Sequence, residues 1–490
     1  MDLTRRDVLR IGATGAGCLV AGVPVAASDV VVNDVQARLN ETRVARILRP
    51  GSAAELADLV RRAAREGRPL AVSGSRHAMG GQQFLRNERL LDLRGMDRIL
   101  SLDAERGLVE AEAGITWPAL LDGLAARQDL APDRWTIVQK QTGTDRLTLG
   151  GALAANAHGR VLRGGPISEQ VEFIRIVGPD GTLHLASRSE NRDLFRHALG
   201  GYGLFGPIAT VGLRLRRRVF LEREVAIQNA TGLSEAFERR IRDGAEYGDW
   251  QYATDVGSGE VLRRGILSTY RPAPPGAVAT VAPREFSAED WSALYLLAHT
   301  DRRRAFETYA RGYLSTSGQI YGSDDQQRVL YDENYHRPID RALAPRPAGS
   351  EVLTEIDIPL TALEPFLEAA RTAVIEDRMD LIYGVVRLIS QDVDSALPWA
   401  RGRFACVIFN LHVSHTRSGL AIARAHFRRL IDLGIAHGGT FYLTYHRWPT
   451  STQYDAAHPA LRAFLAKKRE WDPQERFSSD WYRHLTRLLA

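Results

Sequence analysis

The sequence predicts an α+β protein with more than one domain. The chain has 490 residues, which is enough for two or three domains with a large core. Residues from about 35 to 218 alternate short apolar strand patterns with amphipathic helical patterns. From about 220 to 440 the strands become longer, and helical segments separate them. This change of pattern predicts a boundary between two domains near residue 218.

The elements of the first part can be read in order from their periodicity. The segment 53–65 is an amphipathic helix, and Ser52 before it is a good N-cap because its hydroxyl can accept a first-turn amide. The segment 69–72 is a short apolar run that predicts a buried strand. The remaining expected elements are a strand at 108–113, a helix at 116–127, and a hairpin of 172–177 with 182–186 around Pro179-Asp180-Gly181.

The second part contains longer expected strands with helices between them. The alternating or continuous apolar patterns that indicate these strands lie at 352–358, 384–389 and 404–413. Helical periodicity is found at 363–375 and 420–433. We therefore expect a sheet covered by helices in this part of the chain.

Composition and charge exclude several functional classes. Apolar residues make up 44% and charged residues 25% of the chain, as in soluble globular proteins, and the formal net charge is only +5. The basic run 214–218 ends an expected strand and is interpreted as a solvated face, so no nucleic-acid partner is predicted. The two cysteines are Cys18 and Cys406, and no cysteine-rich or histidine-rich cluster indicates a metal site.

The first 28 residues have the pattern of a targeting segment. Thr4-Arg5-Arg6 and the three residues after it resemble a twin-arginine signal, and a Gly/Ala-rich apolar stretch and small residues near Ala27 follow. A chance arginine pair is the alternative. The apolar stretch is too short for a spanning helix, so no stable membrane anchor is expected. We expect export by the twin-arginine translocase to the periplasm or outside the cell, and no internal disulfide once Cys18 is removed.

A small-residue loop with one histidine follows the strand at 69–72. It reads Gly74-Ser75-Arg76-His77-Ala78, and two further glycines come at 80 and 81. Such a loop lets backbone approach a ligand closely, although an ordinary turn with a surface histidine has the same composition. A second group of motifs follows in residues 145–215. In order, it contains Thr148-Leu149-Gly150-Gly151, Ala157-His158-Gly159, Gly165-Pro166, Leu194-Phe195, Gly200-Gly201 and 203–208, which reads GLFGPI.

These motifs, in this order over about 180 residues, resemble the FAD-binding half of the vanillyl-alcohol-oxidase superfamily, whose FAD-binding domain is called PCMH-type. The resemblance implies a two-lobed FAD-binding domain at 35–218, an antiparallel-sheet substrate or cap domain at 219–440, and a C-terminal segment, 441–490, that returns to the FAD domain. Residues 464–477 are similar to the end of the sugar-1,4-lactone and alditol oxidase branch.

The resemblance implies FAD, bound covalently through His77, although Ala78 stands where relatives have a serine. Gly150, Gly151 and the start of the next helix are expected to meet the pyrophosphate, because a helix N-terminus favours anions. The other residues implied in cofactor binding are Gly74, Ser75, Arg76, Ala78, Gly81, Gln82, Thr144, Asp145, Thr148, Asn156, His158, Gly159, Gly165 and Ile208.

The catalytic residues are implied less directly. Arg387 matches the arginine of a Glu-x-Arg pair in alditol and lactone oxidases, but Val385 replaces the glutamate. His446 and Arg447, on an expected strand returning to the flavin, are candidates for a general base and an oxyanion or carboxylate holder. The alternative for His446 is a neutral, buried structural histidine. Asp145 lies two residues from the aspartate position of cytokinin dehydrogenases, and alternatively it caps the loop after Gly143.

The expected function is that of an exported FAD-dependent oxidoreductase, similar to D-arabinono-1,4-lactone oxidase. It would transfer a hydride from a CH–OH group of a sugar, sugar lactone or polyol to flavin N5, and then pass electrons to oxygen or another acceptor. One alternative is a CH–NH dehydrogenase similar to the cytokinin dehydrogenases. The other is a flavin-binding or electron-carrying protein without turnover, which the missing glutamate at Val385 keeps open.

Overall fold

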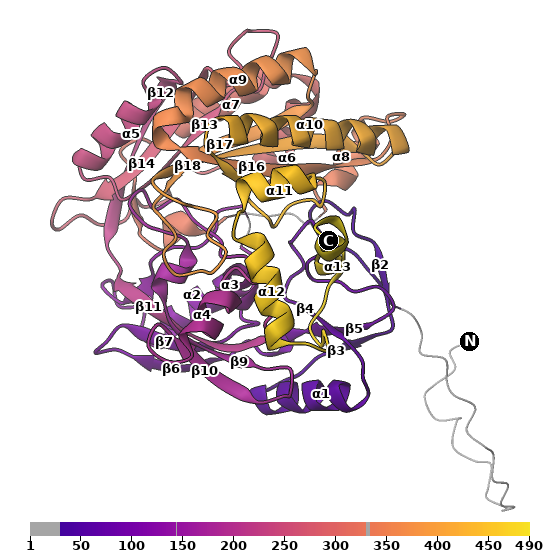
Figure 1. Ribbon diagram of the computed structural model, residues 1–490. Coiled ribbons are helices and arrows are strands. Elements are labelled where there is room, and N and C mark those ends of the chain that lie inside the picture. Colours follow the sequence, from indigo (N-terminus) through magenta and orange to yellow (C-terminus); the bar gives the residue numbers. More distant parts are fainter. Residues whose placement is uncertain (1–29, 144, 330–333) are drawn as a thin grey trace, which may run out of the picture.

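The structure is a computed structural model that describes residues 30–143, 145–329 and 334–490. The expected leader 1–28, with Cys18, and the expected cofactor contact Thr144 lie outside the described residues. Helices and sheets are mixed throughout the described chain, which confirms the α+β class (Figure 1). The strands form an antiparallel pair, a three-stranded, a six-stranded and an eight-stranded sheet among the residues described.

The smallest sheets lie at the start of the chain. Strand β1 (Val30–Val32) pairs with β2 (Thr42–Val44), and the parallel sheet has the order β3 (Arg46–Leu48), β5 (Arg89–Asp92), β4 (Leu70–Ser73). Helix α1 (Ala53–Arg65) joins β3 to β4, and the Ser52 side chain accepts a hydrogen bond from the amide of Glu55. The predicted helix and its cap are therefore confirmed.

The six-stranded sheet carries the predicted hairpin. Its order is β10 (Leu183–Ser187), β9 (Val171–Val177), β11 (Ile208–Arg217), β7 (Leu108–Glu112), β6 (Ile99–Asp103), and β8 (Trp135–Ile137) pairs with the end of β11. Helices α2 (Trp117–Ala126), α3 (Leu149–Ala154) and α4 (Arg192–Ala198) pack on it. β9 and β10 are antiparallel, as predicted for residues 172–186.

The eight-stranded sheet is antiparallel throughout its pairings. The order is β15 (Ile320–Gly322), β12 (Phe220–Asn229), β14 (Arg264–Pro272), β13 (Tyr247–Tyr252), β17 (Leu381–Ile389), β18 (Phe404–Ser414), β16 (Gly349–Pro359), β19 (Thr440–Phe441). Helices α5 (Leu233–Arg242), α9 (Leu363–Glu376) and α10 (Arg417–Ala436) pack against one another and against this sheet at the top of Figure 1. The predicted helices 363–375 and 420–433 are thus confirmed, and α10 is longer than expected.

The opposite face of this sheet is partly covered by three further helices, α6 (Ala288–Thr300), α7 (Arg302–Leu314) and α8 (His336–Ala342). Side chains alternate between the two faces of a strand, so residues of β16, β17 and β18 that are opposite one another form rows. One row contains Asp357, Cys406 and Arg387. The next contains Glu355, Ile408 and Val385. We call this the cavity face, because its side chains line the cavity described below.

The C-terminal segment packs beside the small parallel sheet. It contains α11 (Ser451–Ala457), α12 (Leu461–Trp471) and α13 (Asp480–Leu488), and it runs from the large sheet towards the first domain (Figure 1). Phe477 forms a parallel bridge with Leu70 of β4, and the Leu70 amide donates to the Arg476 carbonyl at 2.7 Å. The segment 445–447 is not a strand, which corrects the expectation, because β19 ends at Phe441 and a turn follows.

Short 3-10 turns complete the secondary structure of the described chain, at Leu93–Gly95, Ile167–Gln170, Asp325–Gln327 and Leu360–Ala362. None of the helices within the described ranges combines the length and apolar character needed to cross a membrane.

Candidate active site

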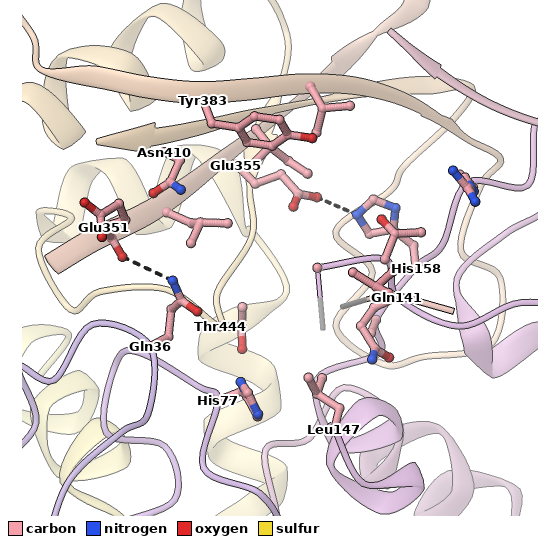
Figure 2. A pocket seen from close by; sticks show the side chains of 18 of the residues that line it. Gln36, His77, Gln141, Leu147, His158, Glu351, Glu355, Tyr383, Asn410 and Thr444 are labelled. Atoms are coloured by element: carbon pink, nitrogen blue, oxygen red, sulfur yellow. Dashed lines mark hydrogen bonds and ion pairs between the residues drawn. The ribbon is translucent and has the colours of Figure 1, made fainter. Parts of the chain in front are cut away.

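A cavity of about 790 Å³ lies between the first domain and the cavity face of the large sheet. Figure 2 shows His77, Gln141 and Leu147 on one side of it and Glu355, Tyr383 and Asn410 on the other. Polar and charged groups therefore face a histidine-bearing loop across the cavity. This is the arrangement of a binding site for an organic molecule.

The loop after β4 forms one wall, and its backbone is held from both sides. The Arg76 carbonyl accepts from the Val35 amide at 3.1 Å, and the Met79 amide donates to the Thr444 carbonyl at 2.9 Å. A Cβ atom on Gly74 would lie 2.1 Å from Thr148 Oγ1, so only glycine fits there. Residues 74–78 line the cavity, as expected for a loop that approaches a cofactor.

His77 faces the cavity with a neutral ring. Burial, and then the positive charge of Arg146, lower the pKa of His77 to about 4. At neutral pH the imidazole therefore carries no charge, and a ring nitrogen keeps the lone pair that a covalent bond to an electrophilic carbon requires. The position and protonation of His77 fit covalent attachment of a flavin.

The start of α3 lines the cavity, and two of its first amides have partners within the protein. The Gly150 amide donates to the Ala113 carbonyl at 2.7 Å, and the Gly151 amide donates to Thr148 Oγ1 at 3.2 Å. These two donors have partners inside the protein, while both glycines line the cavity, so the pyrophosphate role of the helix start stays a prediction. The glycines also allow close packing, since a Cβ on Gly150 would lie 2.7 Å from the Ala113 Cβ.

The structure brings together most, but not all, of the predicted cofactor contacts. The described ones that line the cavity are Gly74, Ser75, Arg76, His77, Ala78, Gln82, Thr148, Gly150, Gly151, His158 and Ile208. Those outside the lining are Gly81, Asp145, Asn156, Gly159 and Gly165. Several of them have other partners: the Asn156 side chain donates to Asp392 at 2.9 Å, the Gly159 amide donates to Gln139 at 3.1 Å, and the Gly165 amide donates to Glu169 at 2.6 Å.

A hydrogen bond joins His158, on the loop after α3, to Glu355 of β16 on the opposite wall. His158 Nε2 lies 2.8 Å from Glu355 Oε1, and the Tyr445 hydroxyl donates to Glu355 Oε2 at 3.2 Å (Figure 2). Burial alone would raise the pKa of Glu355, but His158 and Arg387 outweigh it and lower that pKa. Burial and the Glu355 charge raise the pKa of neighbouring Asp357. Glu355 is therefore the ionised member of this carboxyl pair.

Glu355 supplies a carboxylate near the position where Val385 replaces the glutamate of the expected Glu-x-Arg pair. Val385, which stands in the place of a glutamate, lies in the same row as Ile408 and Glu355. The carboxylate is thus present two strands away, about 10 Å along the row. Arg387, the predicted arginine, lines the cavity and acts on Glu355 electrostatically. Sequence reasoning missed Glu355, although carboxylates at alternating positions 351, 355 and 357 of an apolar strand were a signal.

His446 and Arg447 are not brought to the cavity. His446 stacks on Trp448 at 4.2 Å between ring centroids, and burial, then Arg447, lower its pKa to about 3. Neither residue is part of the cavity lining, whereas Tyr445 is. The physical reason is the turn after β19, which ends the alternation on which the expectation depended. His446 matches the alternative of a neutral buried histidine.

Asp145 is part of a buried ion pair. Its Oδ1 lies 2.5 Å from Lys140 Nζ, and its Oδ2 accepts from the Val329 amide at 2.9 Å. The carboxylate therefore neutralises a lysine and fixes a loop. It does not line the cavity, so the geometry does not bring it to a catalytic position.

A second histidine–carboxylate group ties α6 to the sheet. His299 Nε2 lies 3.0 Å and His412 Nδ1 3.1 Å from Glu351 Oε1, and these three residues are close enough to share a cation. Burial would raise the pKa of Glu351, but its hydrogen bonds with His299 and His412 lower it to about 2. His158, Glu355 and Cys406 form a second such group. Sequence reasoning found no histidine cluster because these residues are far apart in the chain.

Comparisons with known proteins agree with this geometry. Residues 44–187 match the family model described as "FAD binding domain". The chain is 24% identical to an L-gulono-1,4-lactone dehydrogenase of Mycobacterium tuberculosis (strain CDC 1551 / Oshkosh) over 444 residues, which are 90% of this chain and 95% of that protein.

Two rice proteins (Oryza sativa subsp. japonica) match over shorter stretches. L-galactono-1,4-lactone dehydrogenase 1, mitochondrial, is 33% identical over 190 residues, 39% of this chain and 31% of that protein. Cytokinin dehydrogenase 1 is 30% identical over 220 residues, 42% and 40% of the two chains. The chain therefore contains an FAD-binding domain at residues 44–187, and over most of its length it is similar to a protein named as a sugar-lactone dehydrogenase.

Proposed function

We propose that the protein is exported and oxidises a CH–OH group of a sugar, sugar lactone or polyol, with oxygen or another molecule as the final electron acceptor. The observation that carries the proposal is the ionised Glu355, hydrogen-bonded to His158, across the cavity from His77. Relatives named as lactone dehydrogenases, one of them aligned over 90% of this chain, support the CH–OH donor.

Oxidation of CH–OH to C=O releases a hydride and a proton, and FAD, when bound, supplies the hydride acceptor. We assign the proton to His158. Glu355 accepts from Nε2, which leaves Nδ1 as the basic nitrogen, and Nδ1 has no hydrogen-bond partner among the described residues. An imidazolium formed on proton transfer would be stabilised by the adjacent carboxylate, as in other histidine–carboxylate pairs.

Arg387 and Tyr445 complete the proposed arrangement. The Tyr445 hydroxyl donates to the second oxygen of Glu355, so the carboxylate stays oriented towards His158. Arg387 lines the cavity and presents a cation that can hold substrate oxygens, because a guanidinium donates in a fixed fork but is a poor base. The ion pair of Asp145 with Lys140 argues against an aspartate base of the cytokinin-dehydrogenase kind.

The proposed reaction can be tested by anaerobic reduction of the purified yellow protein. We expect at least one sugar, sugar lactone or polyol to bleach the visible flavin band, while an N6-alkenyl purine does not. Bleaching by the purine alone would support the CH–NH alternative. If no compound in a broad panel of alcohols, lactones and amines reduces the flavin, but dithionite reduces it normally, the result would support a protein without turnover.

Export is a separate expectation that depends on the first residues. Changing Arg5 and Arg6 together to lysine should leave the precursor in the cytoplasm, because the twin-arginine translocase reads the arginine pair and not only its charge. Fractionation and immunoblotting of the wild type and the double variant measure this. In the matched control, Arg10, which lies outside the pair, is changed to lysine. Equal periplasmic yield from all three proteins would contradict the assignment.

A further inference from the structure

One end of the cavity holds two buried guanidinium groups. Arg160 comes from the loop after α3, Arg223 from β12, and both line the cavity. Arg223 is 8% exposed, and the Arg160 side chain is 13% exposed. A buried cation is costly unless a negative charge lies close to it, so the charge balance of this end requires an explanation.

The contacts of these two arginines leave hydrogen-bonding capacity unused. Arg160 lies 3.7 Å from Asp249 Oδ2, which is too long for a strong bidentate pair, and its Nε has no hydrogen-bond partner within the described chain. Arg223 donates from Nε to the Ser268 hydroxyl at 3.0 Å and lies over the rings of two tyrosines. Arg160 also donates from Nη2 to the Gln326 carbonyl, and within the described chain neither arginine has a carboxylate nearer than the 3.7 Å contact of Arg160 with Asp249.

The other ionisable groups nearby do not restore neutrality. Burial raises the pKa of Tyr309 and of Tyr321, so these phenols carry no charge at neutral pH. Asp325 is committed to Arg218 at 2.6 Å. Arg284 and Glu285, which also line this end, are solvent-exposed and of opposite sign. Among the described residues at this end of the cavity, two buried guanidinium groups therefore face one buried carboxylate, that of Asp249.

We propose that this end of the cavity binds an anionic group of the substrate, a carboxylate or a phosphate ester, between Arg160 and Arg223. The proposal rests on the proposed function for the rest of the substrate and narrows it to acidic polyhydroxy compounds, that is, sugar acids or sugar phosphates. Two arginines suit an oxyanion because each guanidinium presents several N–H donors in a planar fork. The aromatic rings around them exclude water and strengthen the attraction.

The anion end lies close to the proposed proton acceptor. His158 and Arg160 are two residues apart, so their Cα atoms are at most about 7 Å apart. A substrate whose anionic group is held by Arg160 would thus present a carbon only a few bonds away to His158. The same loop would then select the substrate and accept its proton.

The first test measures anion binding without turnover. Inorganic phosphate should raise the Tm of the flavin-loaded protein above that in sodium chloride of equal ionic strength, because a ligand of the native state stabilises it. Arg223→Met should weaken phosphate binding by about 10²-fold, as for loss of one partner of a buried charge pair. Arg223→Lys should retain part of the binding.

The matched control is Arg271→Met. Arg271 follows Tyr270 on β14 and pairs with Glu222 at 3.0 Å on the other face of the same strands. The Arg271→Met variant removes a positive charge from the same sheet but from the face away from the proposed site. It should therefore leave phosphate binding unchanged. Equal weakening by Arg271→Met and Arg223→Met would reduce the effect to long-range charge and overturn the proposal, as would a wild-type protein that phosphate does not stabilise.

The second test compares substrates in anaerobic flavin reduction, with a neutral sugar, its uronic acid and its phosphate ester. We expect kcat/KM for at least one acidic compound to exceed that for the neutral sugar by about 10²-fold. Arg223→Met should remove this preference, and the control Arg271→Met should keep it. The acid and phosphate arms distinguish the two anions. Preference for the neutral sugar, unchanged by Arg223→Met, would overturn the anion site but leave the proposed oxidation intact. Phosphate binding without flavin reduction by any of the compounds would support the anion site but contradict the proposed oxidation.

Discussion

Replacing His158 with alanine is expected to slow anaerobic flavin reduction by about 10²- to 10⁴-fold, the usual contribution of a positioned proton acceptor. The reason is the 2.8 Å contact with Glu355, which orients the ring and stabilises the cation formed on it. Stopped-flow absorbance under anaerobic conditions measures the rate. The FAD content should stay the same, since the chemistry and not the cofactor is affected.

Two further variants make this prediction specific. Glu355→Gln keeps the size of the side chain but removes its charge, so it should slow the same step by a smaller factor. His446→Ala is the matched control: it also removes a buried histidine, but His446 stacks on Trp448 away from the cavity. A large loss of rate in His446→Ala, with His158→Ala near the wild-type rate, would return the base to the position that the sequence first indicated.

Replacing His77 with alanine is expected to abolish covalent attachment of the flavin completely. Wild-type protein precipitated with acid should stay yellow and carry the flavin mass on the peptide that contains His77. The variant should release its flavin into the supernatant. Absorbance of the two fractions and mass spectrometry of the peptides measure the outcome. A colourless wild-type pellet would contradict the covalent bond, although not FAD binding.

The lowered pKa of His77 predicts that attachment of the flavin is insensitive to pH near neutrality. A group whose pKa is depressed to about 4 is protonated only below that value, so the neutral ring is present throughout the range between about pH 6 and pH 8. Attachment of FAD to the apoprotein should therefore depend little on the state of His77 in this range. His158→Ala is the control here, and it should keep the covalent flavin because the His158 ring contacts Glu355 and is not part of the loop of residues 74–78.

Much of the secondary structure could be predicted because local patterns decide it. Ser52 and the apolar period of the following residues produce α1 at the predicted bounds. The turn at Pro179-Asp180-Gly181 joins β9 to β10 as expected, and Gly181 adopts the positive φ that such a turn favours. The strand expected at 445–447 failed because its apolar neighbours are buried by tertiary contacts and not by a sheet.

The cofactor loop was also predictable, since the motif around His77 is continuous in the chain. The partners of the Gly150 and Gly151 amides could not be predicted from the sequence. The pairing of the Gly150 amide with the Ala113 carbonyl joins α3 to the end of β7, and only the folded chain brings these groups together. Glycine-rich sequence indicates close approach, but it does not say whether a ligand or another backbone approaches.

By itself, the sequence determined the α+β class, the FAD-binding half and the histidine that faces the cavity, because each depends on residues close together in the chain. The tertiary structure alone decided which polar groups meet. Glu355 reaches His158 across 197 positions, and Arg223 of β12 comes together with Arg160 of the loop after α3. Strand register sets these pairings, and register follows from the burial of one face of the whole sheet, which no local pattern specifies.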